Sequence, residues 1–343
     1  MAHENQDPLD EADGLAATLY DASQAPGPRP IGAIADRALA VMRLRASGGE
    51  LPVRTPWASV NEAIWGGLYG GLYVLVSGTG VGKTQWALQV AIAEAQAELE
   101  RSRAEQQYNA AAAPRPVVYV GLELGEVDVV ARVLGLLSGT PWSSLAYGRD
   151  LASFEVARPF EAPLRELPLH VEVAPPRGWG HANIEALVAL RPRLVVLDFL
   201  QLVRAEGRED TRQAMSRIAY AMRAMARDHN TCVLALSSTS RANYAATSGA
   251  RDEGGESLGQ GDPARFVGLG KESGDIEFAA DGVFVLLNEP RAEGEFRRTS
   301  WLAVAKARGG VRGSGWVRLL FDGSRFEESS GPPVTFAPGV GRR

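Results

Sequence analysis

Residues that form disulfides or bind transition metals are scarce in this sequence. It has one cysteine, Cys232, and four histidines among 343 residues. A single thiol excludes an internal disulfide and is typical of cytosolic proteins, so we expect a cytoplasmic protein. Cys232 opens the apolar run CVLALS, which predicts a buried strand residue. The histidines share no ligand-like spacing, so we expect no transition-metal site.

Long apolar runs and an excess of positive charge are also missing. No run approaches the roughly 18 residues of a membrane span. The N-terminal stretch MAHENQDPLDEADG lacks the apolar core of a signal peptide, and we expect no membrane partner. The net charge of −5 argues against a protein whose whole surface binds polyanions. It leaves open a nucleic acid held in a narrow channel, where only local charge matters.

Composition divides the chain into four parts. Residues 1–30 are rich in Asp, Glu, Ala and Pro and predict a disordered acidic tail. We expect a linker helix within residues 31–50, a main domain over 51–328 and a flexible tail over 329–343. The linker helix has an apolar face composed of Ile31, Ile34, Ala38, Val41 and Met42. This face could pack on its own domain or on a neighbouring subunit, and the spacing favours neither.

Apolar runs alternate with helical patterns from Leu51 onward. Seven runs predict strands, at residues 72–77, 117–122, 169–173, 194–198, 232–237, 282–287 and 301–307. Several are apolar throughout, as expected for strands covered on both faces. Helical patterns lie between them, notably at 84–107 and 211–227. The alternation predicts an α/β fold with a mainly parallel, twisted sheet flanked by helices.

A glycine-rich loop joins the first predicted strand to a predicted helix. The loop SGTGVGKT comprises Ser77, Gly78, Thr79, Gly80, Val81, Gly82, Lys83 and Thr84. Backbone N–H groups in such a turn converge on one point, and the glycines let the chain wrap around a phosphate. We expect Lys83 to bind the β and γ phosphates of ATP and the Thr84 hydroxyl to ligate Mg²⁺. The general pattern has glycine where this chain has Ser77.

Two acidic residues follow other predicted strands. Asp198 ends the run LVVLD, where a carboxylate is expected to hold Mg²⁺. Glu123 follows the run VVYVGL, so it would lie at the same edge of the sheet and could act as general base on the attacking water. The alternative for each residue is a solvated acid at a strand end. Together with the loop, the two carboxylates predict ATP hydrolysis.

Six stretches, in order along the chain, carry a family resemblance. They are RTPWASVNEAIWGGLYGGLYVLVSGTGVGKT, VVYVGLELGE, RLVVLDFLQLV, CVLALSSTSRA, GLGKESGDIEFAADGVFVL and WLAVAKARGGVRGSGWVRLLFDGSRFEE. These resemble the C-terminal ATPase domain of DnaB-type replicative helicases, a RecA-fold family, over about residues 51–327. That family also commonly lacks the first glycine of the loop, which accounts for Ser77. The resemblance implies a RecA-like P-loop NTPase in which Glu123 is catalytic and Asp198 binds Mg²⁺.

The resemblance also implies an assembly, expected to be a homo-hexameric ring with nucleotide between adjacent subunits. Lys306 and Arg308 would reach into the neighbour's site, where an arginine neutralises charge on the phosphoryl group. The alternative is a basic pair on a surface hairpin.

A DNA-binding loop and further partners follow from the same resemblance. The loop would hold single-stranded DNA through Lys271, Glu272, Ser273 and Gly274. The alternative is a plain connecting loop. The linker helix would dock on the next subunit, and a loader or other replication proteins would be possible partners.

Three departures from the family pattern bear on function. We find no counterpart of the family's N-terminal helical domain ahead of the linker helix. The family has Ser-Gln where this chain has Ser237-Ser238, and Ser238 is too short to span the same distance. Coupling of hydrolysis to DNA would then be weaker, or carried by Gln201 or Arg241. Between Arg241 and Glu272 there are four basic and five acidic residues, whereas a strong phosphate groove would be more basic.

The sequence therefore predicts an ATP-dependent, ring-forming DNA helicase or translocase. One alternative is a regulatory or DNA-binding module on the same fold, switched by ATP and without unwinding activity. A further alternative is a recombinase-like strand-exchange protein, which the match to the hairpin of Lys306 and Arg308 disfavours.

Overall fold

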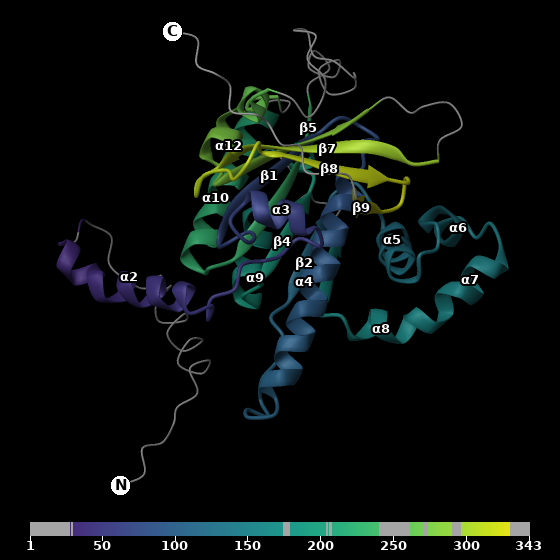
Figure 1. Cartoon of the computed structure of the whole chain (residues 1–343), viewed down its shortest axis with the longest axis horizontal. Coiled ribbons are helices and arrows are strands. Elements are labelled where there is room, and N and C mark those ends of the chain that lie inside the picture. The colour runs from purple at the N-terminus through teal and green to yellow at the C-terminus, as the bar shows by residue number, and fades with distance from the viewer. Residues whose placement is uncertain are drawn as a thin grey trace.

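The computed structural model describes residues 28, 30–173, 179–203, 205, 208–239, 261–269, 274–289 and 296–329. Within these residues, nine strands form one sheet in the order β3-β2-β4-β5-β1-β6-β7-β8-β9 (Figure 1). Neighbouring strands are parallel from β3 to β6 and antiparallel from β6 to β9. The predicted α/β fold with a mainly parallel sheet is confirmed.

The strands match the seven predicted runs and add two. They are β1 (Gly71–Ser77), β2 (Val117–Gly121), β3 (Leu169–Val173), β4 (Leu194–Asp198), β5 (Cys232–Ser238), β6 (Gly282–Asn288), β7 (Arg298–Ala307), β8 (Trp316–Phe321) and β9 (Phe326–Glu328). The last two fall in WLAVAKARGGVRGSGWVRLLFDGSRFEE, the last of the six stretches that carry the family resemblance. The predicted tails lie almost wholly outside the described residues.

The helices lie on both faces of the sheet and at its side. They are α2 (Ile31–Ala46), α3 (Ala58–Ala63), α4 (Lys83–Glu105), α5 (Glu126–Ser138), α6 (Trp142–Ala146), α7 (Leu151–Ala157), α8 (Glu161–Glu166), α9 (His181–Leu190), α10 (Thr211–Asp228) and α12 (Gly274–Ala279). Short 3-10 turns are η1 (Arg158–Phe160), η2 (Leu200–Leu202) and η3 (Pro263–Phe266). No helix of the described residues combines the length and apolar character needed to cross a membrane.

The central strands are apolar throughout because both of their faces are covered. In β1, Leu75 packs with α4 in one core, whereas Leu72, Val74 and Val76 pack with α9 and α10 in the other. Alternate residues of a strand point to opposite faces, so one strand serves two cores. Cys232 opens β5 between the same two layers and is buried, as predicted. Burial raises the pKa of its thiol well above the ordinary value.

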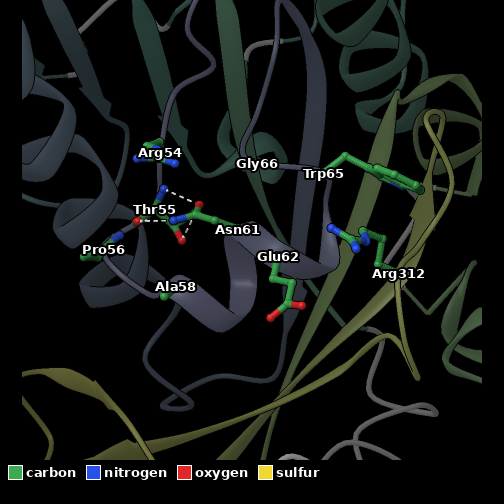
Figure 2. Close-up of a pocket in the computed structure, with 9 residues that line it drawn as sticks. All are labelled: Arg54, Thr55, Pro56, Ala58, Asn61, Glu62, Trp65, Gly66 and Arg312. Carbon is green, nitrogen blue, oxygen red and sulfur yellow. Dashed lines mark hydrogen bonds between the residues drawn. The ribbon is translucent and has the colours of Figure 1, made fainter. Parts of the chain in front are cut away.

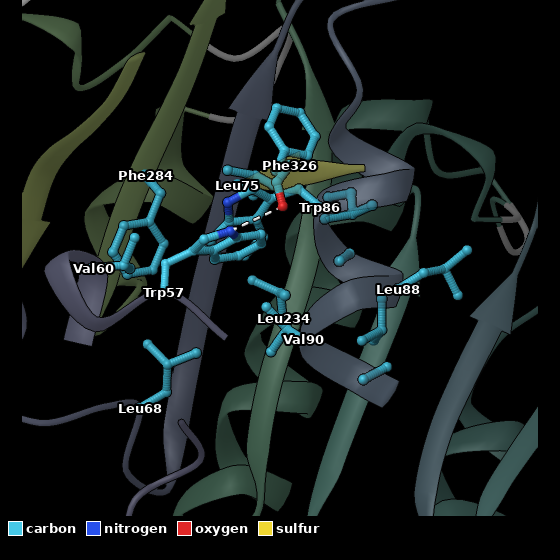
Figure 3. Packing of buried hydrophobic residues seen from close by; sticks show 14 of the residues in the cluster. Trp57, Val60, Leu68, Leu75, Trp86, Leu88, Val90, Leu234, Phe284 and Phe326 are labelled. Carbon is cyan, nitrogen blue, oxygen red and sulfur yellow. Dashed lines mark hydrogen bonds between the residues drawn. The ribbon is translucent and has the colours of Figure 1, made fainter. Parts of the chain in front are cut away.

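Four aromatic rings pack together where the segment before α3 meets β9, so the first and last parts of the domain are in contact (Figure 3). Trp57 precedes α3, is 2% exposed and stacks on Trp86 of α4 with ring centroids 5.0 Å apart. Its indole N–H donates to the carbonyl oxygen of Phe326 in β9 at 3.2 Å, and the Phe326 ring stands edge-on to it. Phe284 of β6 completes the cluster against Trp86. The first and last segments of the domain are therefore held on the same helix.

Helix α2 stands apart from the sheet, and α5 to α8 lie together on the other side (Figure 1). The predicted apolar face of α2 leaves Ile31 80% and Met42 62% exposed. The end of α2 is fixed, because Arg45 pairs with Glu50 at 2.7 Å and Glu50 accepts from Asn230. The structure thus gives no support to packing of the whole apolar face on its own domain.

We expect Trp57→Ala to lower the free energy of unfolding by about 3–5 kcal/mol, because it removes a large buried ring and leaves a cavity. Urea unfolding measures this change. The control is Tyr108→Ala, at a ring that is 81% exposed, which should change stability by less than about 0.5 kcal/mol. Equal effects of the two variants would contradict the role given to the aromatic cluster.

Candidate nucleotide-binding site

The eight predicted residues of the glycine-rich loop are consecutive: Ser77 ends β1, residues 78–82 form the turn, and Lys83 and Thr84 begin α4. Gly80 and Gly82 have backbone φ angles of 75° and 111°, and α4 begins at Lys83. Positive φ is the region that glycine enters without steric cost. The N-terminus of a long helix thus opens directly onto the loop, which favours bound anions.

Gly82 has a second reason to be glycine. A Cβ atom at this position would lie 2.8 Å from the Cζ atoms of both Phe321 and Phe326. These two rings stack on each other at 4.1 Å and lie behind the loop. By contrast, a Cβ atom at Gly80 would meet nothing within 4 Å. Close packing of the loop on β8 and β9 therefore depends on Gly82.

Two buried polar residues that sequence reasoning missed also hold the loop. Asn288, at the end of β6, donates through Nδ2 to the carbonyl oxygen of Val81 at 3.2 Å. The Ser300 hydroxyl on β7 donates to Asn288 Oδ1 at 2.6 Å and so fixes the orientation of the amide. The available signal was a polar residue ending the apolar run GVFVLLN, the same signal that singled out Asp198.

Asp198 and Thr84 meet at the carboxyl ends of the strands. The Thr84 hydroxyl donates to Asp198 Oδ2 at 2.7 Å, and the carboxylate is 1% exposed. The Tyr119 hydroxyl donates to the same oxygen at 2.6 Å. Burial and then the Asp198 charge raise the pKa of Tyr119 well above its ordinary value, so the phenol stays protonated as a donor.

The donor set at this point fits Mg²⁺. Asp198 Oδ1 is buried and has no hydrogen-bond partner among the described residues. An unsatisfied buried carboxylate oxygen is costly unless a cation or a cation-bound water faces it. Hydroxyl and carboxylate oxygens are the ligands that Mg²⁺ prefers, with part of its water shell retained. Thr84 and Asp198 would therefore hold the ion.

Lys83 lies in the same group of charges. Burial lowers the pKa of its ammonium, whereas the carboxylates of Asp198 and Glu123 act in the opposite direction. Glu123 follows β2 and its side chain is exposed. The structure thus brings four predicted residues together at one edge of the sheet, with the lysine buried and the candidate base open to water.

Arg132 of α5 is a further charged neighbour that the sequence did not indicate. Its guanidinium lies over the Trp142 ring at 3.7 Å and donates to Gln85 Oε1 at 3.3 Å. Burial lowers its pKa, opposed by the carboxylates of Asp128 and Asp198. A guanidinium that packs on an aromatic ring therefore lies close enough to Asp198 to interact with its charge.

The predicted coupling residues are only partly described. Gln201 in η2 donates through Nε2 to the Ser237 hydroxyl at 2.9 Å and accepts from the Ser238 N–H at 3.3 Å. The side chain of Gln201 therefore bridges the ends of β4 and β5. Arg241, Lys271, Glu272 and Ser273 lie outside the described residues. Gly274 is the first residue of α12.

Lys306 and Arg308 lie away from the loop of their own chain. Arg308 Nη1 pairs with Asp281 Oδ1 at 2.7 Å, and the other oxygen of Asp281 accepts from the Leu72 N–H at the start of β1. Lys306 Nζ donates to the carbonyl oxygens of Glu277 and Phe278, which belong to α12. Burial and then the Arg308 charge lower the pKa of Lys306. Both cations are thus held at the opposite edge of the sheet.

Two surface hollows lie outside the glycine-rich loop. One, of about 250 Å³, is lined by Arg308, Asp281 and Arg223 among others. The other, of about 680 Å³, lies between α3 and the β7–β8 turn (Figure 2). There the Arg312 guanidinium lies 4.9 Å from the centre of the Trp65 ring, and the Arg312 backbone N–H donates to the Ala63 carbonyl oxygen. These contacts attach the β7–β8 turn, which includes Arg308, to α3.

Gly82→Ala should be more damaging than Gly80→Ala. Both changes place a side chain at positive φ, which costs about 1–2 kcal/mol. Only Gly82→Ala also displaces two packed rings, which adds about 1–3 kcal/mol. Urea unfolding of the two variants measures the difference. Equal loss at both positions would show that the Phe321 and Phe326 rings place no constraint on the loop.

Comparisons with known proteins agree with this geometry. The model of the DnaB-like helicase C-terminal domain family matches residues 52–328. One solved structure, of an isolated ATPase domain, is 18% identical with a TM-score of 0.63, and the match covers 89% of this chain and all of that one. A second solved structure is described as that of a DnaB-like replicative helicase and its interactions with primase. It is 17% identical with a TM-score of 0.61, and the match covers 94% of this chain and 73% of that one. Comparison with curated proteins gave no match.

The two solved structures show the fold, and the family match extends over most of the chain. The predicted resemblance is confirmed, and with it the RecA-like form of the α/β fold. The chain belongs to the family of DnaB-like helicase C-terminal domains.

Proposed function

We propose that this protein is an ATP-dependent, ring-forming DNA helicase or translocase that hydrolyses MgATP between adjacent subunits. The observation that carries the proposal is the separation of the two halves of the site. Arg308 is held by Asp281 at the amino end of β1, whereas the phosphate loop follows its carboxyl end. The five-residue step from Leu72 to Ser77 spans about 16 Å in a strand, which is further than an arginine side chain reaches. Arg308 therefore does not reach the loop of its own chain, which supports a role at another subunit's nucleotide.

Each residue at the loop has a defined task in this proposal. The loop amides and Lys83 bind the triphosphate, and Thr84 and Asp198 hold the metal ion. When bound, Mg²⁺ neutralises charge on the β and γ phosphate oxygens. Glu123, exposed beside Lys83, accepts a proton from the attacking water. Arg308 from the neighbour balances the charge that develops on the transferred group, and Lys306 supports it.

The exposed apolar surfaces support assembly into a ring, proposed to be a homo-hexamer. Helix α2 exposes Ile31, Leu39 and Met42, and α7 exposes Leu151 and Phe154. Two apolar surfaces on different sides of one chain suit a head-to-tail contact, which closes into a ring when the rotation permits. Such a contact would cover α2, which its own domain leaves exposed.

The proposed DNA contact is linked to this interface by α12. The helix begins at Gly274, the last residue of the proposed DNA loop, and its last turn accepts hydrogen bonds from Lys306. A six-residue helix is about 9 Å long, so Gly274 lies within about that distance of the helix end that Lys306 contacts. Single-stranded DNA is the proposed track. One solved relative is described with its primase interactions, and we propose replication proteins as partners here.

A second candidate function is an ATP-switched module without unwinding activity. The observation that favours it is Ser238, whose N–H is occupied by Gln201 and whose side chain is too short to replace the family's glutamine. In that case ATP would organise an assembly and DNA would not stimulate hydrolysis.

A subunit-mixing experiment tests the shared site. We expect Arg308→Ala to lower the ATPase rate by about 10³-fold or more, because transition-state charge is left unbalanced. Mixing it with inactive Lys83→Ala subunits should restore activity, since each variant supplies the half that the other lacks. Arg318→Ala, at an exposed arginine on β8, is the control and should retain activity. Failure of the mixture to recover would remove the shared site.

A forked-duplex assay separates the two candidate functions. With excess ATP we expect unwinding by the wild type, none by Lys83→Ala, and an ATPase rate that rises with single-stranded DNA. Nucleotide binding without unwinding, and without stimulation by DNA, would support the switched module.

A further inference from the structure

The Tyr119 side chain is polar inside an otherwise apolar strand. It lies two residues before the end of β2 and is fully buried. Its hydroxyl donates to Asp198 Oδ2 at 2.6 Å, although its own strand position pairs with Val196. The ring therefore leans along the strand toward its carboxyl end. The residue of β2 that pairs with Asp198 is Gly121.

Gly121 provides the space for this lean. Residues two apart on a strand share a face, so a side chain at position 121 would stand next to the Tyr119 ring. A Cβ atom there would lie 3.1 Å from Tyr119 Cε1, closer than ordinary contact. The strand ends are also fixed together, because the Leu122 N–H donates to the Asp198 carbonyl oxygen at 2.7 Å. The hydroxyl of Tyr119 is thus directed to a single carboxylate.

The contact decides which oxygen of Asp198 is available. Oδ2 accepts from both Tyr119 and Thr84, whereas Oδ1 is buried without a partner among the described residues. A carboxylate with only one donor could turn about its Cβ–Cγ bond and exchange its oxygens. With two donors on Oδ2, the orientation of the carboxylate is fixed, and Oδ1 remains without a hydrogen bond among the described residues. The Thr84 oxygen keeps its lone pairs for the ion while its proton points to Asp198.

We propose that Tyr119 is a positioning residue for magnesium, which holds the Asp198 carboxylate in the orientation that receives the ion or its water. The inference rests on the proposed MgATP site and adds a residue to it. Groups that hydrogen-bond a metal-binding residue set its orientation, and their loss commonly lowers metal affinity 10–100-fold.

The test is Tyr119→Phe, which keeps the ring and removes only the hydroxyl. Binding of a fluorescent ADP analogue is titrated with Mg²⁺, starting in EDTA, so that the readout does not depend on turnover. We expect the half-saturating Mg²⁺ concentration to rise about tenfold. Affinity for the metal-free nucleotide should stay unchanged, because the loop and Lys83 are untouched.

Two further variants separate positioning from general stability. Tyr73→Phe makes the same change in β1, at a ring that stacks on Phe284, and should leave the Mg²⁺ titration unchanged. Gly121→Ala keeps the Tyr119 hydroxyl but crowds its ring, and should raise the Mg²⁺ requirement by a smaller factor. It also keeps the proposal testable if Tyr119→Phe folds poorly.

The outcomes distinguish this inference from the proposed function. Wild-type nucleotide binding that ignores Mg²⁺ would overturn the proposed function itself. A normal wild-type titration with an unchanged Tyr119→Phe titration would overturn only the role of Tyr119. Reduced thermal stability of Tyr119→Phe with an unchanged Mg²⁺ requirement would likewise show that the hydroxyl is merely structural.

Discussion

The parallel alignment of β1, β2, β4 and β5 is the constraint on which the candidate site depends. Parallel strands end at a common edge, so residues far apart in sequence become neighbours there. The register pairs Ser77 with Ser238 and Gly121 with Asp198. The glycine-rich loop, the proposed metal ligand Asp198 and the proposed coupling residue Ser238 therefore lie at one edge of the sheet. What the sheet requires is that its strands be apolar up to this edge and polar immediately beyond it.

That same pattern explains why much of the site could be predicted from the sequence. An apolar run followed by a polar residue is a local signal, and it predicted Glu123 and Asp198 as site residues, whereas the glycine-rich loop predicted Lys83. The contacts of Tyr119, Asn288 and Arg132 could not be predicted in this way, because each connects segments that only the fold brings together. Helices α6 to α8 were not predicted for a related reason. They have five to seven residues each, so their stability comes from packing rather than from a sustained periodic pattern.

The positions of Lys306 and Arg308 could be predicted only in part. The family resemblance implied a role in a neighbour's site, but it did not indicate the groups that hold them. Asp281 fixes Arg308 through both its backbone and its side chain, and α12 takes the hydrogen bonds of Lys306. Both cations thus begin from defined contacts within their own chain. To bind a neighbour's phosphate, Arg308 would leave Asp281 and Lys306 would leave α12. Nucleotide binding in the neighbour and the loss of these contacts would then occur together.

Cys232 has a consequence of a different kind. It is the sole cysteine of the chain, it lies inside β5, and burial keeps its thiol protonated and unreactive. A cysteine introduced on an exposed helix such as α2 or α7 would then be the only accessible thiol with which a maleimide dye could react. The natural sequence is therefore already a clean background for distance measurements by fluorescence or spin labels, and motion between neighbouring copies could be followed without first removing a native residue.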